Sequence, residues 1–258
     1  MPTAHNGDVS IHYDSTGEGD ETVVFVGDVG FGAWQWAWQH RAVAGPFRAI
    51  VFDHRGVGRS DAPPGPYSIG DLADDLDAVL ADAGVSRAHL VGAGIGGLVA
   101  LELTHGSGRV RSLALVGCGL GDVDPLGAFA PPDDPAALKS STEALLSASF
   151  RREQPDVIEQ IVAWRGEEDA SRKIWEAQAA AVEGFEPPPL YEVTTPALVV
   201  HGEADAYWPV EGARTLADGL PRGELLSFEA GRLVGVERSR VVNDRLVGLV
   251  ESESGSES

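Results

Sequence analysis

Short apolar runs rich in β-branched residues alternate along this chain with segments of helical hydrophobic spacing. The strand-like runs are residues 9–13, 22–26, 47–52, 89–91, 112–116 and 197–200. Except for the first, which alternates apolar and polar residues, they suit strands buried on both faces of a parallel sheet. Helical segments between such strands form right-handed crossovers. The order of elements predicts an α/β fold with a mostly parallel, twisted sheet of about eight strands, flanked by helices.

The clearest helical segment follows Ser68. Ser68 is a suitable N-cap, and a carboxylate, Asp71, stands three residues later. Apolar residues then recur on one helical face until Gly84, a natural stop. Residues 95–105 and 236–250 are predicted as further helices.

Residues 120–190 interrupt this rhythm. Prolines cluster at both ends of the segment, and helical patterns carrying Phe150, Trp164, Trp175 and Phe185 lie between them. We predict a helical cap insertion at 120–190 within a core formed by residues 1–119 and 191–250. The aromatic residues either pack the insertion onto the sheet or line a ligand pocket beneath it. The last segment, 251–258, is predicted to be a disordered acidic tail.

The charge balance narrows the set of partners. The formal net charge is −21, which disfavours nucleic acid and anionic membranes. A solvated surface explains the excess acid, and a salt-rich habitat is an alternative. Cys118 is the single cysteine, so no intrachain disulfide can form, which fits a cytoplasmic location. The first residues do not resemble a signal peptide, and no apolar run of about 18 residues indicates a membrane span.

Four segments, in order, carry a resemblance to a known superfamily. They are FDHRGVGRSD at 52–61, HLVGAGIGG at 89–97, PALVVHGEAD at 196–205 and EAGRL at 229–233. They resemble the loop after the fourth strand, the nucleophile elbow, the acid loop and the histidine loop of the α/β-hydrolase superfamily. The resemblance covers about residues 8–250. It implies the capped branch, whose members act on small esters, lactones, epoxides, C–C bonds or peroxyacids.

Two of these loops depart from the pattern that the resemblance implies. The elbow motif Gly-x-Ser-x-Gly has Gly94 at the serine position. Arg232 stands at the histidine position, and a guanidinium stays protonated in proteins. The acid position is retained as Asp205, which we expect to pair with Arg232. The pair either holds structure or binds an anionic group of a substrate. We therefore predict a degenerate catalytic triad.

The loop after residues 22–26 also differs. It reads Gly27-Asp28-Val29-Gly30, and the family's two oxyanion donors map to the backbone N–H groups of Val29 and Ile95. A carboxylate at Asp28 opposes a developing oxyanion if it is ionised. Asp28 is at the same time the strongest candidate for an acid or base; its alternative role is to cap the following turn. We predict Asp28, Asp205 and Arg232 as catalytic residues.

Other residues are candidates for substrate contacts. Besides Val29, Gly94 and Ile95, these are Trp34, Cys118 and Asp122. Trp34, with Trp36 and Trp38, forms either an aromatic wall or part of the core. Cys118 is a possible nucleophile or a packed thiol, and Asp122 an alternative acid or a solvent-facing loop residue.

No cofactor is expected. No cluster of His, Cys, Asp and Glu has the spacing of a metal site. Residues 92–97 also satisfy G-x-G-x-x-G, the phosphate turn of dinucleotide enzymes. That turn normally opens its domain, and no ribose-binding acid follows the next strand, so dinucleotide binding is disfavoured.

These observations predict a repurposed, non-hydrolytic enzyme. We expect a cyclase, isomerase or lyase that acts on a hydrophobic small molecule, as in a biosynthetic pathway. It requires an apolar pocket that touches Asp28 and Arg232. Two alternatives stay open: a non-catalytic ligand-binding or interaction protein, and a residual esterase or lactonase.

Overall fold

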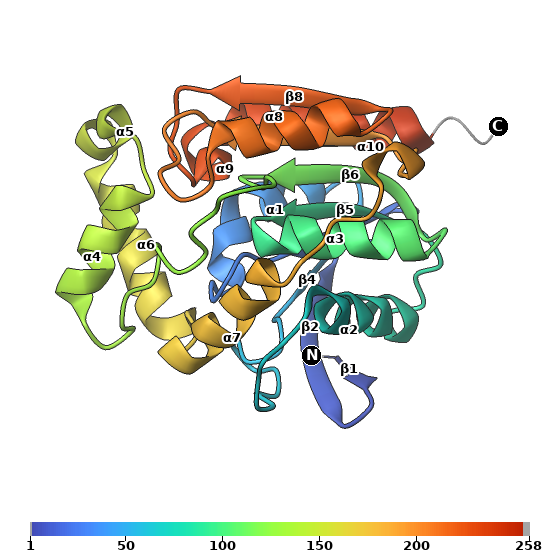
Figure 1. Cartoon of the computed structure of the whole chain (residues 1–258), viewed down its shortest axis with the longest axis horizontal. Helices are drawn as coiled ribbons and strands as arrows, with labels where there is room; N and C mark the ends of the chain where they lie inside the picture. The colour runs from blue at the N-terminus through green and yellow to red at the C-terminus, as the bar shows by residue number, and fades with distance from the viewer. Residues whose placement is uncertain (1, 255–258) are drawn as a thin grey trace.

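The computed structural model describes residues 2–254, which form one eight-stranded sheet with helices on both faces (Figure 1). The strand order is β1-β2-β4-β3-β5-β6-β7-β8. Strands β1 and β2 run antiparallel to their neighbours, and the other pairs are parallel. The predicted mostly parallel sheet is confirmed. The strands are β1 (Thr3–Asn6), β2 (Val9–Thr16), β3 (Thr22–Val26), β4 (Arg48–Phe52), β5 (Ala88–Ala93), β6 (Val110–Val116), β7 (Ala197–Gly202) and β8 (Gly223–Phe228).

Helices cover the two faces of the sheet in separate groups. One apolar core lies between the sheet and α2 (Ile69–Asp82), α3 (Ile95–Gly106) and α8 (Val210–Gly219). The second core lies on the opposite face, under α1 (Ala37–Val43) and α10 (Ser239–Ser254). Central strands such as β3, with all five residues buried, serve both cores, which explains their continuous apolar sequence.

The boundaries of α2 follow from its sequence. The Ser68 side chain accepts the N–H of Asp71 at 3.1 Å, and the Asp71 side chain accepts the N–H of Ser68 at 2.8 Å. This reciprocal cap satisfies two donors that the helix itself leaves unpaired. Gly84 follows the helix with a φ of 67°, so the predicted start and stop are both confirmed.

Along the chain, four helices follow β6 and precede β7, and they lie at one end of the molecule (Figure 1). They are α4 (Pro135–Ala144), α5 (Ala148–Glu153), α6 (Pro155–Glu168) and α7 (Arg172–Glu183). Trp175 of α7 is buried and packs edge-on against Phe31 and Phe129, with ring centroids 5.3 and 5.6 Å apart. Trp164 of α6 is half-buried and lies at a groove that is described below.

Two strands and one helix boundary differ from the sequence-based expectations. Strands β1 and β8 were not predicted, since β1 is short and polar and β8 is an edge strand with half-exposed residues. The helix predicted at 236–250 is two helices, α9 (Val234–Glu237) and α10. Because α10 continues to Ser254, residues 251–254 of the predicted disordered tail are helical. Residues 255–258 lie outside the described part of the chain.

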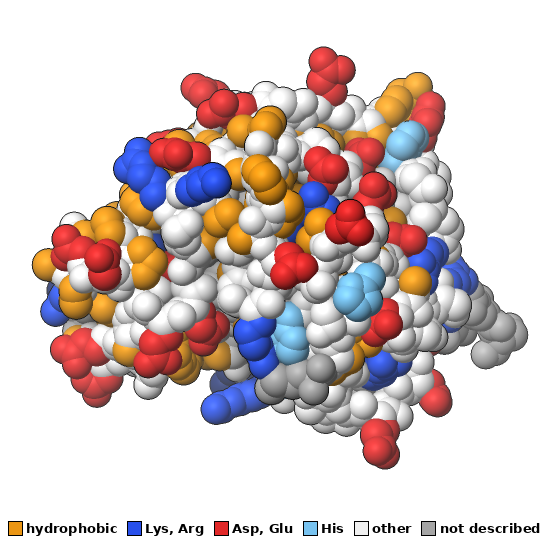
Figure 2. Space-filling model, turned by 90° about the horizontal axis from the view of Figure 1, so that it is seen from below, with side chains coloured by type: hydrophobic (Ala, Val, Ile, Leu, Met, Phe, Trp, Pro, Cys, Tyr) orange, Lys and Arg blue, Asp and Glu red, His pale blue; other side chains and the backbone are white. Residues whose placement is uncertain are grey.

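The surface carries the charge that the composition implies. On the face shown in Figure 2, acidic side chains outnumber basic ones and are scattered rather than gathered in one patch. Within residues 2–254, no helix is long and apolar enough to cross a membrane.

Candidate functional site

Four loops meet at the edge of the sheet where the parallel strands end. The loop after β3 carries Asp28, the turn after β5 carries Gly94, the loop after β7 carries Asp205, and the loop after β8 carries Arg232. Parallel strands bring their carboxyl ends to one edge, and this is where α/β folds place their ligands. The segments are far apart in sequence, but the Arg232 side chain contacts those of both Asp28 and Asp205.

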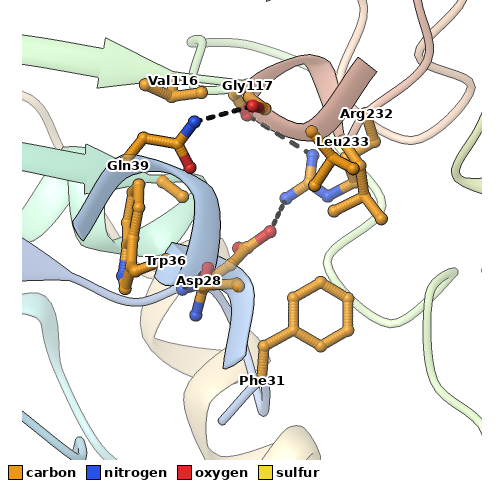
Figure 3. Close-up of a pocket in the computed structure, with 12 residues that line it drawn as sticks. Asp28, Phe31, Trp36, Gln39, Val116, Gly117, Arg232 and Leu233 are labelled. Carbon is orange, nitrogen blue, oxygen red and sulfur yellow. Dashed lines mark hydrogen bonds and ion pairs between the residues drawn. The ribbon is translucent and has the colours of Figure 1, made fainter. Parts of the chain in front are cut away.

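Arg232 lies at the centre of this meeting point (Figure 3). Its Nη2 is 2.5 Å from Asp28 Oδ2, and its Nη1 is 3.2 Å from Asp205 Oδ2. The guanidinium also lies over the Trp208 ring, 4.9 Å from the ring centroid. All three charged residues are buried, with exposed fractions of 5 to 8 %. The predicted ion pair between Asp205 and Arg232 is confirmed, and Asp28 is a second partner.

The network holds Arg232 in its charged form. Burial alone lowers the pKa of the guanidinium, but the charges of Asp28 and Asp205 and their hydrogen bonds raise the pKa above its usual value. Arg232 therefore cannot act as a proton acceptor at any physiological pH. Asp205 is fixed from its other side, since its Oδ1 accepts the N–H groups of Tyr207 and Trp208 at 2.9 and 3.1 Å.

The second oxygen of Asp28 occupies the two predicted oxyanion donors. Asp28 Oδ1 accepts the N–H of Val29 at 2.8 Å and the N–H of Ile95 at 3.3 Å. Ile95 begins α3, so its N–H also carries the positive end of a helix dipole. The Asp28 side chain thus lies at the place where the resemblance predicts an oxyanion site. Because Asp28 accepts the N–H at the start of α3, that N–H is not available to bind the phosphate of a dinucleotide.

Gly94 makes room for that carboxylate. It adopts φ 47° and ψ −115°, in the left-handed region that favours glycine. A Cβ at this position would overlap Asp28 Oδ1 and would lie 2.6 Å from Arg232 Nη2. The space that a side chain at position 94 would need is therefore taken by the ion network.

Little room is left beside the network. The cavity lined by Asp28, Trp36, Gln39, Arg232 and Leu233 has a volume of about 30 Å³. This is enough for about two water molecules. Pockets for drug-sized ligands have volumes of about 300–1,000 Å³.

Three of the predicted contact residues, Cys118, Trp34 and Asp122, do not line this cavity. Cys118 is fully buried beside the network, and burial, with the nearby charge of Asp28, raises the pKa of its thiol to about 12. Trp34 points away, since its Nε1 donates to Asp169 Oδ1 at 2.8 Å. Asp122 is exposed and does not line the cavity. Within residues 2–254, no group of three or more His, Cys, Asp or Glu side chains is arranged to hold a metal ion.

Other contributors were not identified from the sequence. Gln35 Oε1 accepts the N–H of Asp28 at 3.1 Å, and Gln39 Nε2 donates to the carbonyl oxygen of Gly235 at 2.7 Å. His54 Nε2 donates to the carbonyl oxygen of Gly27 at 3.0 Å, because a carbonyl oxygen can only accept. Burial lowers the pKa of His54, which favours its neutral form. The spacing of Gln35 and Gln39, four residues apart directly after the Asp28 loop, was the signal available in the sequence.

Comparison with known proteins agrees with this architecture. Residues 30–238 match the family model described as alpha/beta hydrolase fold. A relative named "Putative carbamate hydrolase RutD", from Azorhizobium caulinodans, is 42 % identical over 117 residues, which are 45 % of this chain and 44 % of that protein. The chain thus spans less than half the length of that relative in the match.

Two further similarities extend over most of the chain. The 2-hydroxy-6-oxononadienedioate/2-hydroxy-6-oxononatrienedioate hydrolase of Paraburkholderia phymatum is 31 % identical, over 86 % of this chain and 83 % of that protein. The solved structure titled "Est816 as an N-Acyl homoserine lactone degrading enzyme" superposes with a TM-score of 0.78 and 31 % identity, over 96 % of this chain and 99 % of that one. The first of these is named as a hydrolase, and the second as a lactone-degrading enzyme.

Proposed function

The chain belongs to the α/β-hydrolase fold family, and we propose that it is a non-catalytic, ligand-binding member in which a closed ion network replaces the family's reactive centre. The observation that carries this proposal is the bond from Asp28 Oδ1 to the N–H groups of both Val29 and Ile95. Hydrolysis through a tetrahedral intermediate needs those two donors free.

The other requirements of serine hydrolysis are also unmet. Gly94 supplies no nucleophile, and Arg232 cannot accept a proton from one. Cys118 does not replace the serine, because its thiol stays protonated near neutral pH and is fully buried. We therefore propose a triad that is degenerate at two of its three positions, in which Asp205 holds a cation in place of a histidine.

A non-hydrolytic enzyme at this centre is disfavoured by the cavity. The cyclase, isomerase or lyase hypothesis requires an apolar pocket that touches both Asp28 and Arg232. The space beside them is about 30 Å³, and it is bordered by a paired carboxylate and guanidinium. We therefore do not retain that hypothesis. The ligand of the protein is proposed to be a small molecule rather than a nucleic acid, given the net charge of −21, and a cytoplasmic location is proposed from the single cysteine.

A residual esterase or lactonase is the second candidate. It is favoured by the relatives, which are named as a hydrolase and a lactone-degrading enzyme. The two backbone donors also keep the positions from which they would act if Asp28 moved away.

Turnover of an activated aryl ester and an aryl lactone separates the two candidates. We expect the purified protein to match the buffer rate, and Asp28→Asn and Arg232→Ala to do the same. Turnover above the buffer rate that one of these substitutions abolishes would contradict the first proposal and support the second.

A variant that restores the residues expected of a serine hydrolase tests the proposal in the opposite direction. The combined variant Asp28→Gly, Gly94→Ser, Arg232→His frees the donors, restores a nucleophile and restores a base beside Asp205. We expect ester turnover above buffer in this variant, but not in Gly94→Ser alone, where the new side chain overlaps Asp28. Turnover of Gly94→Ser alone that exceeds the buffer rate and equals that of the combined variant would show that the ion network does not block the site.

A further inference from the structure

A second, larger cavity shares only Trp36 with the cavity beside the ion network. It is a groove of about 500 Å³ between β2, α1, the end of β4 and α6 of the insertion. Its volume falls within the range of about 300–1,000 Å³ that small-molecule sites occupy. Trp36 and Trp164 contribute aromatic surface to it, and Asp53 and Glu168 contribute carboxyl groups. None of the three charged residues of the ion network lines this groove.

Two buried polar atoms at the groove have no hydrogen-bond partner within the described residues. Trp36 is 4 % exposed, and its Nε1 is unpaired. Figure 3 shows this nitrogen at the edge of the ring that lies away from Arg232. His12 is 8 % exposed, and its Nε2 is unpaired, since the nearest carboxylate oxygen, Asp14 Oδ1, is 4.0 Å away. Buried polar groups are nearly always paired, so unpaired ones in a groove point to a ligand that supplies the partners.

The unpaired charge in the groove is negative. Asp53 and Glu168 are half-buried, and among residues 2–254 neither forms an ion pair. Each accepts only a backbone N–H: Asp53 from Arg59 at 3.0 Å, and Glu168 from Trp34 at 2.9 Å. Burial raises the pKa of both carboxyl groups, and a cation bound between them would lower the pKa of each.

The basic groups of the groove offset this charge only in part, since the nearby Arg59 opposes the effect of burial on the pKa of Asp53 without outweighing it. The Arg59 guanidinium is directed to Asp14, at 3.2 Å, and Arg41 is exposed at the rim. Burial lowers the pKa of His40, which favours its neutral form. The groove therefore combines aromatic faces, two carboxyl groups that form no ion pair within the described residues, and one indole N–H without an acceptor.

We propose that this groove binds a small organic ammonium compound with an apolar ring and a hydroxyl or carbonyl acceptor. The ammonium group lies between Asp53 and Glu168 and against the Trp164 ring, where charge attraction and a cation–π contact act together. The acceptor takes the N–H of Trp36. The site lies outside the ion network, so this proposal does not depend on whether that centre is catalytic.

A matched series of three probes tests the charge preference. 2-Amino-1-phenylethanol carries the ammonium group, 1-phenyl-1,2-ethanediol replaces it with a hydroxyl, and mandelate carries a carboxylate; all three share the ring and the benzylic hydroxyl. Calorimetric titration of the wild-type protein is expected to show the amine binding at least about fivefold tighter than the diol, and mandelate binding more weakly than both. Equal binding of amine and diol, or tighter binding of mandelate, would overturn the proposal.

Single substitutions locate the site. Glu168→Gln is expected to weaken binding of the amine about fivefold and to leave binding of the diol unchanged. Glu167→Gln, at the exposed neighbouring residue of α6, is the matched control and is expected to change neither. Trp36→Phe keeps an aromatic ring but removes the N–H, and is expected to weaken amine and diol alike, about fivefold.

Folding of each variant is checked by its thermal midpoint, and ester turnover is measured in the same preparations. A folded Glu168→Gln protein that binds the amine as the wild type does contradicts the site. Probe binding with turnover at the buffer rate supports both this site and the proposed function. Ester turnover in the wild type contradicts only the proposed function.

Discussion

Removal of the Arg232 charge is the most direct test of the ion network. Arg232→Met keeps most of the side-chain volume but removes both ion pairs, at 2.5 and 3.2 Å, and leaves Asp28 and Asp205 buried without a cation. Breaking a buried pair by removing one partner costs about 3–5 kcal/mol. Each carboxylate keeps two backbone N–H donors, so we expect a value near the lower end, about 3 kcal/mol.

The measurement is the free energy of unfolding from urea titration, with the m-value followed to confirm that the transition stays two-state. A loss of about 3 kcal/mol corresponds to a fall in the melting temperature of roughly 6–12 °C for a chain of this size class. Two controls separate charge burial from other effects. Arg172→Met breaks an exposed ion pair to Glu176, and is expected to cost at most about 0.5 kcal/mol.

The second control removes all three charges together. The combined variant Asp28→Asn, Asp205→Asn, Arg232→Met leaves no unpaired charge, so it is expected to be more stable than Arg232→Met alone. A loss below about 1 kcal/mol for Arg232→Met, or a combined variant no more stable than the single one, would refute the reasoning, because the carboxylates would then not depend on the guanidinium.

Two further predictions concern the neighbours of the network. Gly94→Ala is expected to destabilise the protein by about 2 kcal/mol or more, since the backbone has a positive φ and the new Cβ overlaps Asp28. Gly248→Ala, in the open middle of α10, is expected to stabilise it by about 0.5–1 kcal/mol. Urea titration of both variants measures the two changes in the free energy of unfolding, and an unchanged stability of Gly94→Ala would contradict the predicted steric overlap. Cys118 is expected to resist iodoacetamide at pH 8 in the native protein and to react once the chain is unfolded, as followed by mass spectrometry. Because the folded thiol has a pKa of about 12 against an ordinary value of 9.0, its contribution to stability is complete below about pH 9 and is lost as the pH rises toward 12. Native alkylation at pH 8 would show that the thiol is accessible and ionised.

The sequence predicts the parts of this fold that bury apolar residues in a regular pattern. Strand β3, buried at every position, and α2, with its reciprocal cap at Ser68 and Asp71, are both evident from spacing alone. Strand β8 could not be predicted in this way, because an edge strand of half-exposed residues needs no strict alternation.

The arrangement of the ion network could be predicted from the sequence only in part. The sequence places Asp28 beside the N–H groups of Val29 and Ile95, and indicates that a carboxylate there opposes an oxyanion. It does not give the side-chain rotamer that places one oxygen on both donors and the other on Arg232. That rotamer depends on contacts between loops more than 60 residues apart along the chain, which only the packed structure defines.

The three unusual residues of the centre form one interdependent unit rather than three separate losses. Asp28 can reach the N–H of Ile95 only because Gly94 has no Cβ, and its buried charge is acceptable only because Arg232 neutralises it. Arg232 in turn needs Asp205, the retained acid, as its second partner. Restoring a side chain at position 94 alone creates a steric overlap, and restoring a histidine at position 232 alone leaves Asp28 without its full positive partner. Each of these single substitutions is therefore expected to lower the free energy of unfolding. This mutual dependence is what the proposed function requires of the centre, because under that proposal the four loops keep a structural role.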